Sequence, residues 1–316
     1  MRIVFWGNGN RGVACLGVLC ERGYRSELAV VHPPAGGSWH ACLADVAGEL
    51  GIRAIAPDDP NDASTAAALQ KAQADVFVLA GYGKILRQHI IDIPRLMCIN
   101  LHAGKVPEYR GSSPLNWALL NGENSFGLSV LKLDGGVDSG DVLMQREFEI
   151  CANDTIRELH SIANEQFPVM LLEVLEQIES GRCMPKPQDP KRARYFPLRF
   201  PDDGLVLWDQ LTAKQIHNRI RALTEPYPCA YTYFKGRKVK LISSEPASTI
   251  YNGESGRVYR KKDRGLLVCA ADTCLWIKQA CFADDDTPLA DAVQRYERLA
   301  TVGGLATAHL SAEARG

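Results

Sequence analysis

The first half of the chain alternates short apolar runs with longer segments in which apolar residues recur every three or four positions. The runs at residues 2–6 and 75–80 end at glycine turns and are typical of strands buried on both faces of a sheet. The long amphipathic segment at residues 156–179 predicts a helix, with Pro168 as a point where it can bend. Repeated strand–helix units predict a mostly parallel sheet with helices on both faces.

The same periodicities place the other elements of this half. Strands are expected at residues 27–32, 53–56, 98–101 and 126–133. Helices are expected at residues 12–22, 38–50, 63–72 and 114–120.

The pattern changes at a proline-rich stretch from residue 185 to 204, which predicts a domain boundary. Beyond it, one amphipathic helix at residues 213–223 precedes short apolar runs broken by glycines. These runs predict five strands, at residues 230–234, 238–243, 256–259, 266–270 and 274–278. The expected architecture is α/β: a Rossmann-like domain at 1–190, a linker at 191–203, a smaller β-rich, OB-like domain at 204–303 and a disordered tail at 304–316.

Composition adds little to this picture but excludes some classes. The 316 residues are 46% hydrophobic and 23% charged, with a formal net charge of -1, so no global field for nucleic acid or membrane exists. The ten cysteines are scattered without a CxxC pair, which favours reduced core residues over a disulfide framework or a zinc site. Without a signal-peptide pattern or a transmembrane-length run, a cytoplasmic location is expected.

A glycine motif follows the first strand. Gly7, Gly9 and Gly12 match G-x-G-x-x-G, which by itself suggests a dinucleotide site. The acidic residue that would bind the ribose is missing at the end of the second strand, where the chain reads Val31-His32. A nicotinamide-dependent oxidoreductase is therefore only a remote alternative.

Three polar side chains stand where loops leave predicted strands. Asn100 and His102 are two residues apart, so they point to the same side of an extended segment, and Asp138 follows a later strand through a glycine turn. Taken singly, each is better explained as a structural group: Asn100 as a loop cap, His102 as a partner of a backbone carbonyl and Asp138 as a turn cap. Together they favour a site, because open parallel sheets bind ligands at strand ends.

The chemistry that suits these groups is attack by a neutral amine on an activated carbonyl. Asn100 can donate a hydrogen bond to a developing oxyanion, and His102 can hold that oxygen or move a proton. Asp138 can orient His102 or favour its protonated form. The chain offers no comparably good Ser or Cys nucleophile, so the attacking group is expected to belong to the substrate.

The motif Asn100-Leu101-His102, the loop through Tyr109-Arg110-Gly111 and the later Asp138 resemble the formyltransferases that use 10-formyltetrahydrofolate. The family pattern is N-x-H followed by L-L-P-x-Y-R-G, and here Gly104-Lys105-Val106 replaces its usual Ser-Leu-Leu, a change expected to alter the entrance to the site. The resemblance implies that Asn100, His102 and Asp138 are the catalytic trio and that no metal is needed.

The resemblance also implies where the folate donor binds. Its pterin is expected against glycine-rich main chain, which can approach a flat heterocycle closely. The implied cofactor-binding residues are Gly81, Tyr82, Gly83, Lys84, Ile85, Leu86, Asp134, Gly135, Gly136 and Val137.

Three subfamilies compete for the acceptor. Glycinamide ribonucleotide transformylases are shorter than this chain. Methionyl-tRNA formyltransferases carry a basic loop after the second strand, whereas residues 32–50 here contain no Lys or Arg. From Asp203 onward, the chain has sixteen Lys and Arg and thirteen Asp and Glu. This excess of positive over negative residues is small for a tRNA-binding surface. The basic runs at 235–240 and 260–262 are the candidates for such a face, or simply solvated strand edges.

The third subfamily acts on nucleotide-linked amino sugars. Residues 113–123, 199–204 and 217–223 resemble segments of the UDP-4-amino-4-deoxyarabinose formyltransferases. A nucleotide diphosphate needs only a few cationic contacts, for which Tyr109, Arg110, Arg199 and Arg221 are candidates, although interdomain salt bridges would explain the two last arginines equally well. We therefore expect formyl transfer to a small nucleotide-sugar amine in glycan biosynthesis, with nucleic acid and membrane as unlikely partners and a homodimer as the family-based expectation. A methionyl-tRNA formyltransferase is the alternative, and a non-catalytic folate sensor is a further one.

Overall fold

The computed structural model describes residues 1–33 and 42–304, which form two compact units. The first unit lies within Met1–Pro114, Ser125–Glu149 and His160–Leu198, and the second comprises Leu115–Asn124, Ile150–Leu159 and the described chain from Arg199. This division differs from the expected linear one, because two short segments of the expected first domain pack in the second unit. Residues 38–41 of an expected helix and 305–316 of the expected tail lie outside the described residues.

A seven-stranded sheet forms the centre of the first unit, in the order β3-β2-β1-β4-β5-β7-β8. Strands β1 to β5 pair in parallel, whereas β7 and β8 are antiparallel additions at one side. The expectation of a mostly parallel sheet is confirmed. The strand order reverses at β1, between β2 and β4, which is where open sheets of this kind bind ligands. The strands are β1 Arg2–Gly7, β2 Arg25–Val31, β3 Ala54–Ile55, β4 Val76–Ala80, β5 Met97–His102, β7 Ser125–Lys132 and β8 Val142–Glu149.

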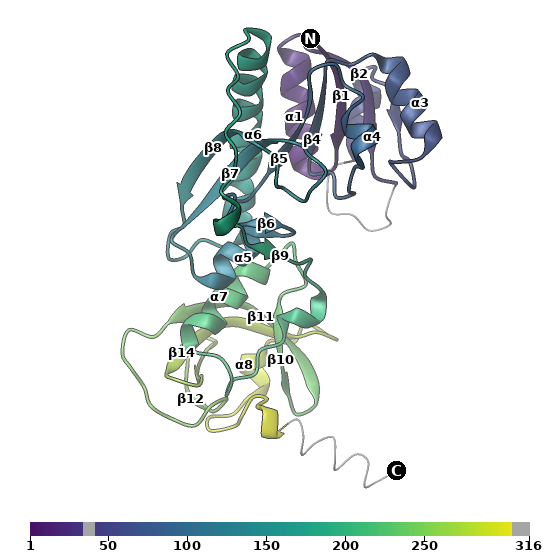
Figure 1. The fold of residues 1–316 in the computed structure, drawn as a ribbon. Coiled ribbons are helices and arrows are strands. Elements are labelled where there is room, and N and C mark those ends of the chain that lie inside the picture. Colours follow the sequence, from purple (N-terminus) through teal and green to yellow (C-terminus); the bar gives the residue numbers. More distant parts are fainter. Residues whose placement is uncertain (34–41, 305–316) are drawn as a thin grey trace. The chain divides into compact units, whose positions relative to one another are not determined.

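Helices cover both faces of this sheet (Figure 1). Because side chains alternate along a strand, Val4 and Trp6 of β1 face one layer, where α3 and α4 complete a core cluster through Leu69 and Ile90. Helices α1 and α6 lie on the other face, where the Arg11 guanidinium stands 5.0 Å from the ring centre of Phe167. The helices of this unit are α1 Gly9–Glu21, α2 Leu43–Glu49, α3 Ala63–Ala72, α4 Gln88–Ile91 and, from His160 onward, α6 Ile156–Glu179, whereas α5 Pro114–Asn121 belongs to the second unit from Leu115 onward.

Some of these elements were not predicted. Strand β8 was missed because its outer positions are polar, so it alternates as an edge strand rather than forming an apolar run. The four-residue α4 is too short to show a helical period. A second small sheet pairs β6 (Arg110–Gly111) with β9 (Tyr195–Phe196), and neither of these two-residue strands was predicted.

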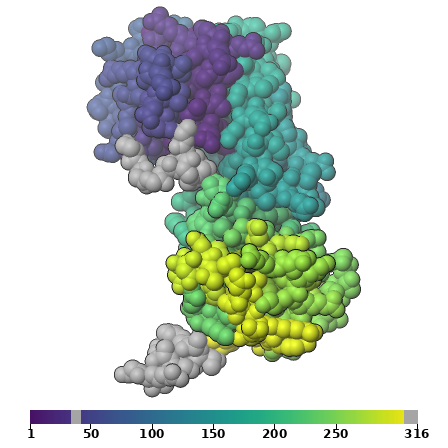
Figure 2. Space-filling model, turned by 180° about the vertical axis from the view of Figure 1, so that it is seen from behind, coloured from purple at the N-terminus to yellow at the C-terminus, as the bar shows by residue number. Residues whose placement is uncertain are grey.

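The second unit contains a five-stranded antiparallel sheet in the order β10-β11-β14-β13-β12, which confirms the expected separate β-rich domain. Helix α7 begins with a capping box between Thr212 and Gln215 and packs on this sheet. The last described segments, yellow in Figure 2, pack closely on the green strands of the same unit. Its elements are α7 Ala213–Leu223, β10 Ala230–Phe234, β11 Arg237–Pro246, β12 Val258–Lys262, β13 Gly265–Cys269, β14 Cys274–Phe282 and α8 Leu289–Ala292.

Most cysteines are free, as expected, but one pair is not. Cys269 and Cys274 form a disulfide, because they stand directly opposite each other where β13 pairs with β14. Burial raises the pKa of the Cys15 thiol to about 12, so this side chain behaves as a small apolar core residue. Within residues 1–33 and 42–304, no helix is both long and apolar enough to span a membrane.

Candidate active site

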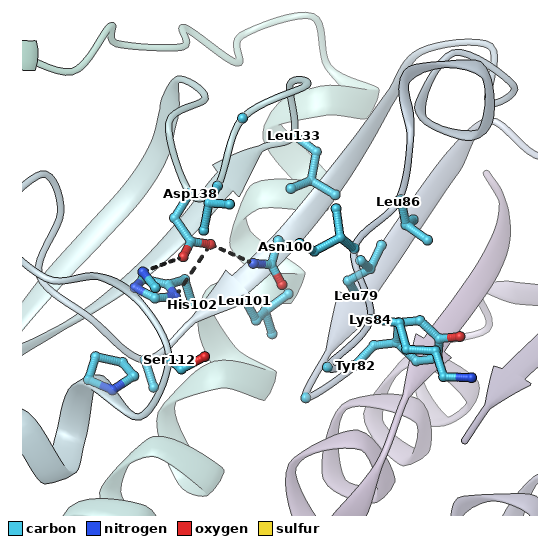
Figure 3. A pocket seen from close by; sticks show the side chains of 18 of the residues that line it. Leu79, Tyr82, Lys84, Leu86, Asn100, Leu101, His102, Ser112, Leu133 and Asp138 are labelled. Carbon is cyan, nitrogen blue, oxygen red and sulfur yellow. Dashed lines mark hydrogen bonds and ion pairs between the residues drawn. The ribbon is translucent and has the colours of Figure 1, made fainter. Parts of the chain in front are cut away.

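Asn100, His102 and Asp138 meet at one point of the first unit. Asn100 and His102 lie on β5, two residues apart, and both point toward the Asp138 carboxylate (Figure 3). Asp138 Oδ1 lies 3.4 Å from Asn100 Nδ2 and 3.5 Å from His102 Nδ1. The His102 and Asp138 side chains are only 7% and 11% exposed, so their interaction is weakly screened by water. The sequence therefore predicted three residues that the fold brings together.

His102 is held from both sides by oxygen atoms. Its Nε2 lies 2.6 Å from the Tyr109 carbonyl oxygen, and its Nδ1 faces Asp138. A carbonyl oxygen and a carboxylate can only accept hydrogen bonds, so each ring nitrogen of His102 faces an acceptor.

Gly104 makes this arrangement possible. A Cβ at residue 104 would lie 2.3 Å from the Tyr109 oxygen and 2.4 Å from His102 Nε2, so any side chain would occupy the space of their contact. The neighbouring Lys105 does not line the pocket but bonds Glu147 of β8 through Nζ, at 2.8 Å. In the departure at Gly104-Lys105-Val106, Gly104 thus leaves room for the contact between His102 and Tyr109, and an altered entrance stays a prediction.

Asp138 reaches the other two residues through a tight loop. Its own φ is +48°, in the left-handed region, and its Oδ2 accepts a hydrogen bond of 2.8 Å from the Gly111 amide. Earlier in the loop, Asp134 Oδ1 accepts from the Gly136 amide and the Ser139 hydroxyl. The Asp138 carboxylate is therefore held by the conformation of its own loop and by the Gly111 amide.

A cavity of about 420 Å³ opens beside the trio, and main chain and apolar side chains form much of its wall. Figure 3 shows Leu79, Leu86 and Leu133 around it, together with Asn100 and Asp138. Of the ten predicted cofactor-binding residues, nine line this cavity and Gly135 does not. Their contact with folate stays a prediction. The nine are Gly81, Tyr82, Gly83, Lys84, Ile85, Leu86, Asp134, Gly136 and Val137.

The loop after β4 is fixed by contacts outside the cavity. The ring of His32 stacks on Tyr82 at 4.5 Å, and its Nε2 accepts a hydrogen bond from the Gly83 amide. Burial, and then the nearby Lys84, lower the pKa of His32, which keeps the ring neutral as an acceptor. Lys84 Nζ bonds the carbonyl oxygens of residues 57 and 58, so its charge holds the loop in place. Burial raises the pKa of Tyr82 to about 12.

The four predicted acceptor contacts are distributed over both units. In the first, Tyr109 stacks on Phe196 at 4.8 Å, whereas Arg110 is 5% exposed and bonds Gln188 and Tyr195. In the second, Arg221 donates to Asn218 Oδ1 and to the backbone oxygens of Cys151 and Asp154.

Arg199, also in the second unit, stacks on the ring of Trp117 at 4.8 Å. Its buried Nε has no hydrogen-bond partner within the described part of the chain. Burial lowers the pKa of Arg199 and also that of Arg221. The binding of acceptor by all four residues stays a prediction.

The glycine motif after β1 has a packing role in the structure. The Asn8 amide donates to the Ala80 oxygen at the end of β4, and a Cβ on Gly7 or on Gly12 would lie 3.2 or 3.3 Å from that oxygen. The glycines therefore allow the first turn to sit against β4. Arg11 from the same turn lines the cavity, a role that the sequence pattern did not indicate.

Two further residues were missed. Ser112 lines the cavity next to Gly111, and Gln188 bonds the loop that carries Asp138. No sequence signal marks Gln188, because it lies 50 residues from its partner in an irregular segment. No cluster of three His, Cys, Asp or Glu side chains able to hold a metal occurs in the described residues.

The fold and this trio define a formyl-transferring enzyme, and comparison with known proteins agrees. Residues 45–175 match the family model described as Formyl transferase, and residues 200–292 match its C-terminal domain. The chain is 32% identical over 288 residues to the methionyl-tRNA formyltransferase of Acetivibrio thermocellus, covering 89% of this chain and 92% of that protein. The enzyme of that name from Caldanaerobacter subterraneus is 33% identical over 276 residues, covering 85% and 88%.

A solved structure with the same fold is the N-formyltransferase from Helicobacter canadensis, in complex with folinic acid and dTDP-3-aminofucose. Its TM-score is 0.68 at 18% identity, and the match covers 87% of this chain and 97% of that one. The chain belongs to the formyltransferase family and is an enzyme that transfers formyl groups. Its co-substrate is the formyl-folate that this family uses, 10-formyltetrahydrofolate.

Proposed function

We propose that the enzyme transfers the formyl group to the amine of a nucleotide-linked amino sugar. The observation that carries this choice concerns the basic run at 235–240, in which three of the four cations are paired with acids of the same unit and the fourth, Lys238, lies 3.8 Å from the ring centre of Tyr231. Lys235 pairs with Glu297 at 2.6 Å, Arg237 with Asp284 and Asp285 at 2.7 Å each, and Lys240 with Asp286 at 3.0 Å. A polyanion such as tRNA gains affinity by neutralising unpaired cations along its phosphates, and this run offers few.

A nucleotide sugar needs fewer contacts than tRNA, and the described residues include candidates for them. Its base needs an aromatic surface, and Tyr195 is 58% exposed, with the Arg110 guanidinium 5.5 Å from its ring centre. Its diphosphate needs a few directed donors, and we propose the Arg199 guanidinium as one of them. We keep Tyr109, Arg110, Arg199 and Arg221 as proposed contacts, with Arg199 first among them.

The trio can perform the transfer without a protein nucleophile. The donor supplies an activated formyl carbon, and the acceptor nitrogen forms the new bond to it while the bond to the folate nitrogen breaks. Asn100 presents amide hydrogens at the cavity wall, where they can stabilise negative charge on the formyl oxygen. One proton must pass from the acceptor amine to the leaving folate nitrogen, and Asp138 with His102 are the groups placed to hold it.

The test is a direct assay with the full chain. The protein is incubated with 10-formyltetrahydrofolate and a panel of nucleotide-linked amino sugars that differ in base and in amine position, and products are followed by mass. A gain of one formyl group on a panel member supports the proposal. Formylation of methionyl-tRNA alone, with every sugar unchanged, would overturn it.

Methionyl-tRNA is the second candidate acceptor, and one observation of the second unit favours it. A hollow of about 480 Å³ is lined by Arg260, Lys261, Lys262 and Arg295 beside Trp276, a combination that suits phosphates and a stacked base. The relatives that match over most of the chain are methionyl-tRNA formyltransferases. On this alternative, tRNA affinity falls steeply with salt, and the Arg260→Ala/Lys262→Ala variant lowers both the affinity and the salt slope.

A further inference from the structure

The position of the Asp138 carboxylate depends on the backbone beneath it. Asp138 has a φ of +48°, a conformation that few non-glycine residues adopt, and its two oxygens serve Gly111, Asn100 and His102. A side chain of two rotatable bonds can meet all three partners only if its own main chain stays in place. The loop from 134 to 141 therefore needs an anchor.

Gln188 provides hydrogen bonds at this point. Its Nε2 donates to the Asp138 carbonyl oxygen at 2.9 Å and to the Gly140 carbonyl oxygen at 2.6 Å. A primary amide has two hydrogens on nitrogen, so both are used to hold the same loop. The two bonds hold the backbone at Asp138, which carries the catalytic carboxylate, and at Gly140, two residues further along the loop.

Arg110 fixes the orientation of this amide. Gln188 Oε1 accepts from Arg110 Nε at 3.0 Å and from Arg110 Nη2 at 2.8 Å. A guanidinium only donates and the two loop carbonyls only accept, so the assignment of the amide oxygen and nitrogen is unambiguous. Arg110 is 5% exposed and also donates through Nη1 to the Tyr195 hydroxyl, at 2.8 Å.

These contacts close a ring around Asp138. Arg110 precedes Gly111, whose amide binds the Asp138 carboxylate, and Arg110 binds Gln188, which binds the Asp138 backbone. Both Arg110 and Gly111 lie on β6, which pairs with β9. Strand β6 thus restrains Asp138 in two ways. The Gly111 amide binds the Asp138 carboxylate directly, and Arg110 holds the Asp138 backbone through Gln188.

We propose that Gln188 is a positioning residue for formyl transfer, acting by holding the Asp138 backbone where the carboxylate meets Asn100 and His102. The role rests on the transfer reaction itself and not on the choice of acceptor. A glutamate would keep the bond to Arg110 but turn an oxygen toward two carbonyl oxygens. A methionine would fill a similar volume and donate nothing.

The experiment compares Gln188→Met and Gln188→Glu with Gln279→Met, a matched change at an exposed glutamine on β14. Turnover is measured with the acceptor that the panel identifies and expressed per active site, counted by binding of 5-formyltetrahydrofolate. For Gln188→Met we expect kcat to fall about 10- to 100-fold, because small displacements of catalytic groups have effects of this size, while KM for each substrate changes less than threefold.

Two further readouts separate positioning from general damage. Gln188→Glu should recover relative to wild type as the pH is lowered, because the protonated acid can again donate one hydrogen bond. Arg110→Met combined with Gln188→Met should be no worse than the less active single variant, since both act through one ring.

An acceptor-free readout keeps the inference distinct from the proposed function. Hydrogen–deuterium exchange in the peptide that covers residues 134–141 should become faster in Gln188→Met and stay unchanged in Gln279→Met. Unchanged exchange, or a kcat per site within twofold of the control, would overturn the role of Gln188. If no acceptor of either class is formylated, the proposed function fails while the exchange result still decides this inference.

Discussion

The two units use charged side chains in opposite ways. In the first, His102 and Asp138 are 7% and 11% exposed, and each is held by backbone groups as well as by the other. In the second, Arg237 and its partners Asp284 and Asp285 are 42%, 61% and 49% exposed. Buried polar groups depend strongly on every partner, whereas exposed ion pairs are screened and contribute little. We therefore expect formyl transfer to depend on a few buried contacts of the first unit, and the second sheet to tolerate the loss of its exposed ion pairs.

The largest effect that separates the units is expected at the trio. Asn100→Ala and His102→Ala should each lower formyl transfer about 10²- to 10³-fold, the size expected for losing a group that stabilises the transition state. Turnover and far-UV circular dichroism are measured together, with the exposed Gln70→Ala as control. Wild-type turnover in both variants would refute the assignment of the active site.

A smaller loss is expected at Gly104, which leaves the trio intact. Gly104→Ala places a methyl group 2.3 Å from the Tyr109 oxygen, so His102 must move, and activity should fall about tenfold or more. The matched control is Gly17→Ala within α1, where a Cβ meets nothing within 4 Å and helix propensity should stabilise by about 0.5–1 kcal/mol. Equal activity in Gly104→Ala and Gly17→Ala would show that the His102 side chain can shift without loss of activity.

A pH effect of moderate size is expected from His217 in the second unit. Burial lowers the pKa of His217, with Arg221 acting in the same direction against Ala152 and Glu245, and its Nδ1 bonds Ser244. A lowered folded-state pKa means that protonation favours unfolding. This contribution to stability is therefore present above the ordinary pKa of His and is lost as the pH falls from there through the lower pKa of the folded state.

The measurement for His217 is the melting temperature between pH 7.5 and 5.5. His217→Asn should show a smaller decrease over this range than the wild type, because the variant lacks this titration. The half-buried His32 remains in both proteins and contributes equally. An identical decrease in the two proteins would contradict the role assigned to His217.

The smallest effect is expected at the exposed pairs. Arg237→Ala removes the contacts to Asp284 and Asp285 but should leave turnover unchanged and shift the melting temperature only slightly, since such pairs are worth little. A loss of turnover comparable to that of His102→Ala would show that the comparison between the units is wrong.

Part of the site follows from local rules. Asn100 and His102 share one side of β5 because side chains alternate along a strand, and this needs no knowledge of the fold. Asp138 was placed on weaker grounds, since β7 runs antiparallel to β5 and ends with Lys132 opposite Ile99. The loop after β7 must turn back to bring Asp138 to His102. Only the strand order and the contacts of that loop determine this path.

The fold, like the site, was predicted only in part from local patterns. The apolar runs of β1 and β4 predicted buried parallel strands, and the five short runs of the second unit predicted its sheet. The packing of residues 115–124 and 150–159 in the second unit was not predicted, because both lie between elements of the first. Periodicity reports which side of an element is buried but not which partner buries it.

The sequence by itself therefore determined the class of fold and identified three polar residues that meet in the structure. The tertiary structure decided how His102 is seated against Tyr109, which cations of the second unit are paired, and that Gln188 holds the loop of Asp138. The physical reason is how far apart the interacting residues lie along the chain. Helix and strand patterns arise from neighbours along the chain, whereas hydrogen bonds near 3 Å between residues 50 positions apart exist only once the whole unit has packed.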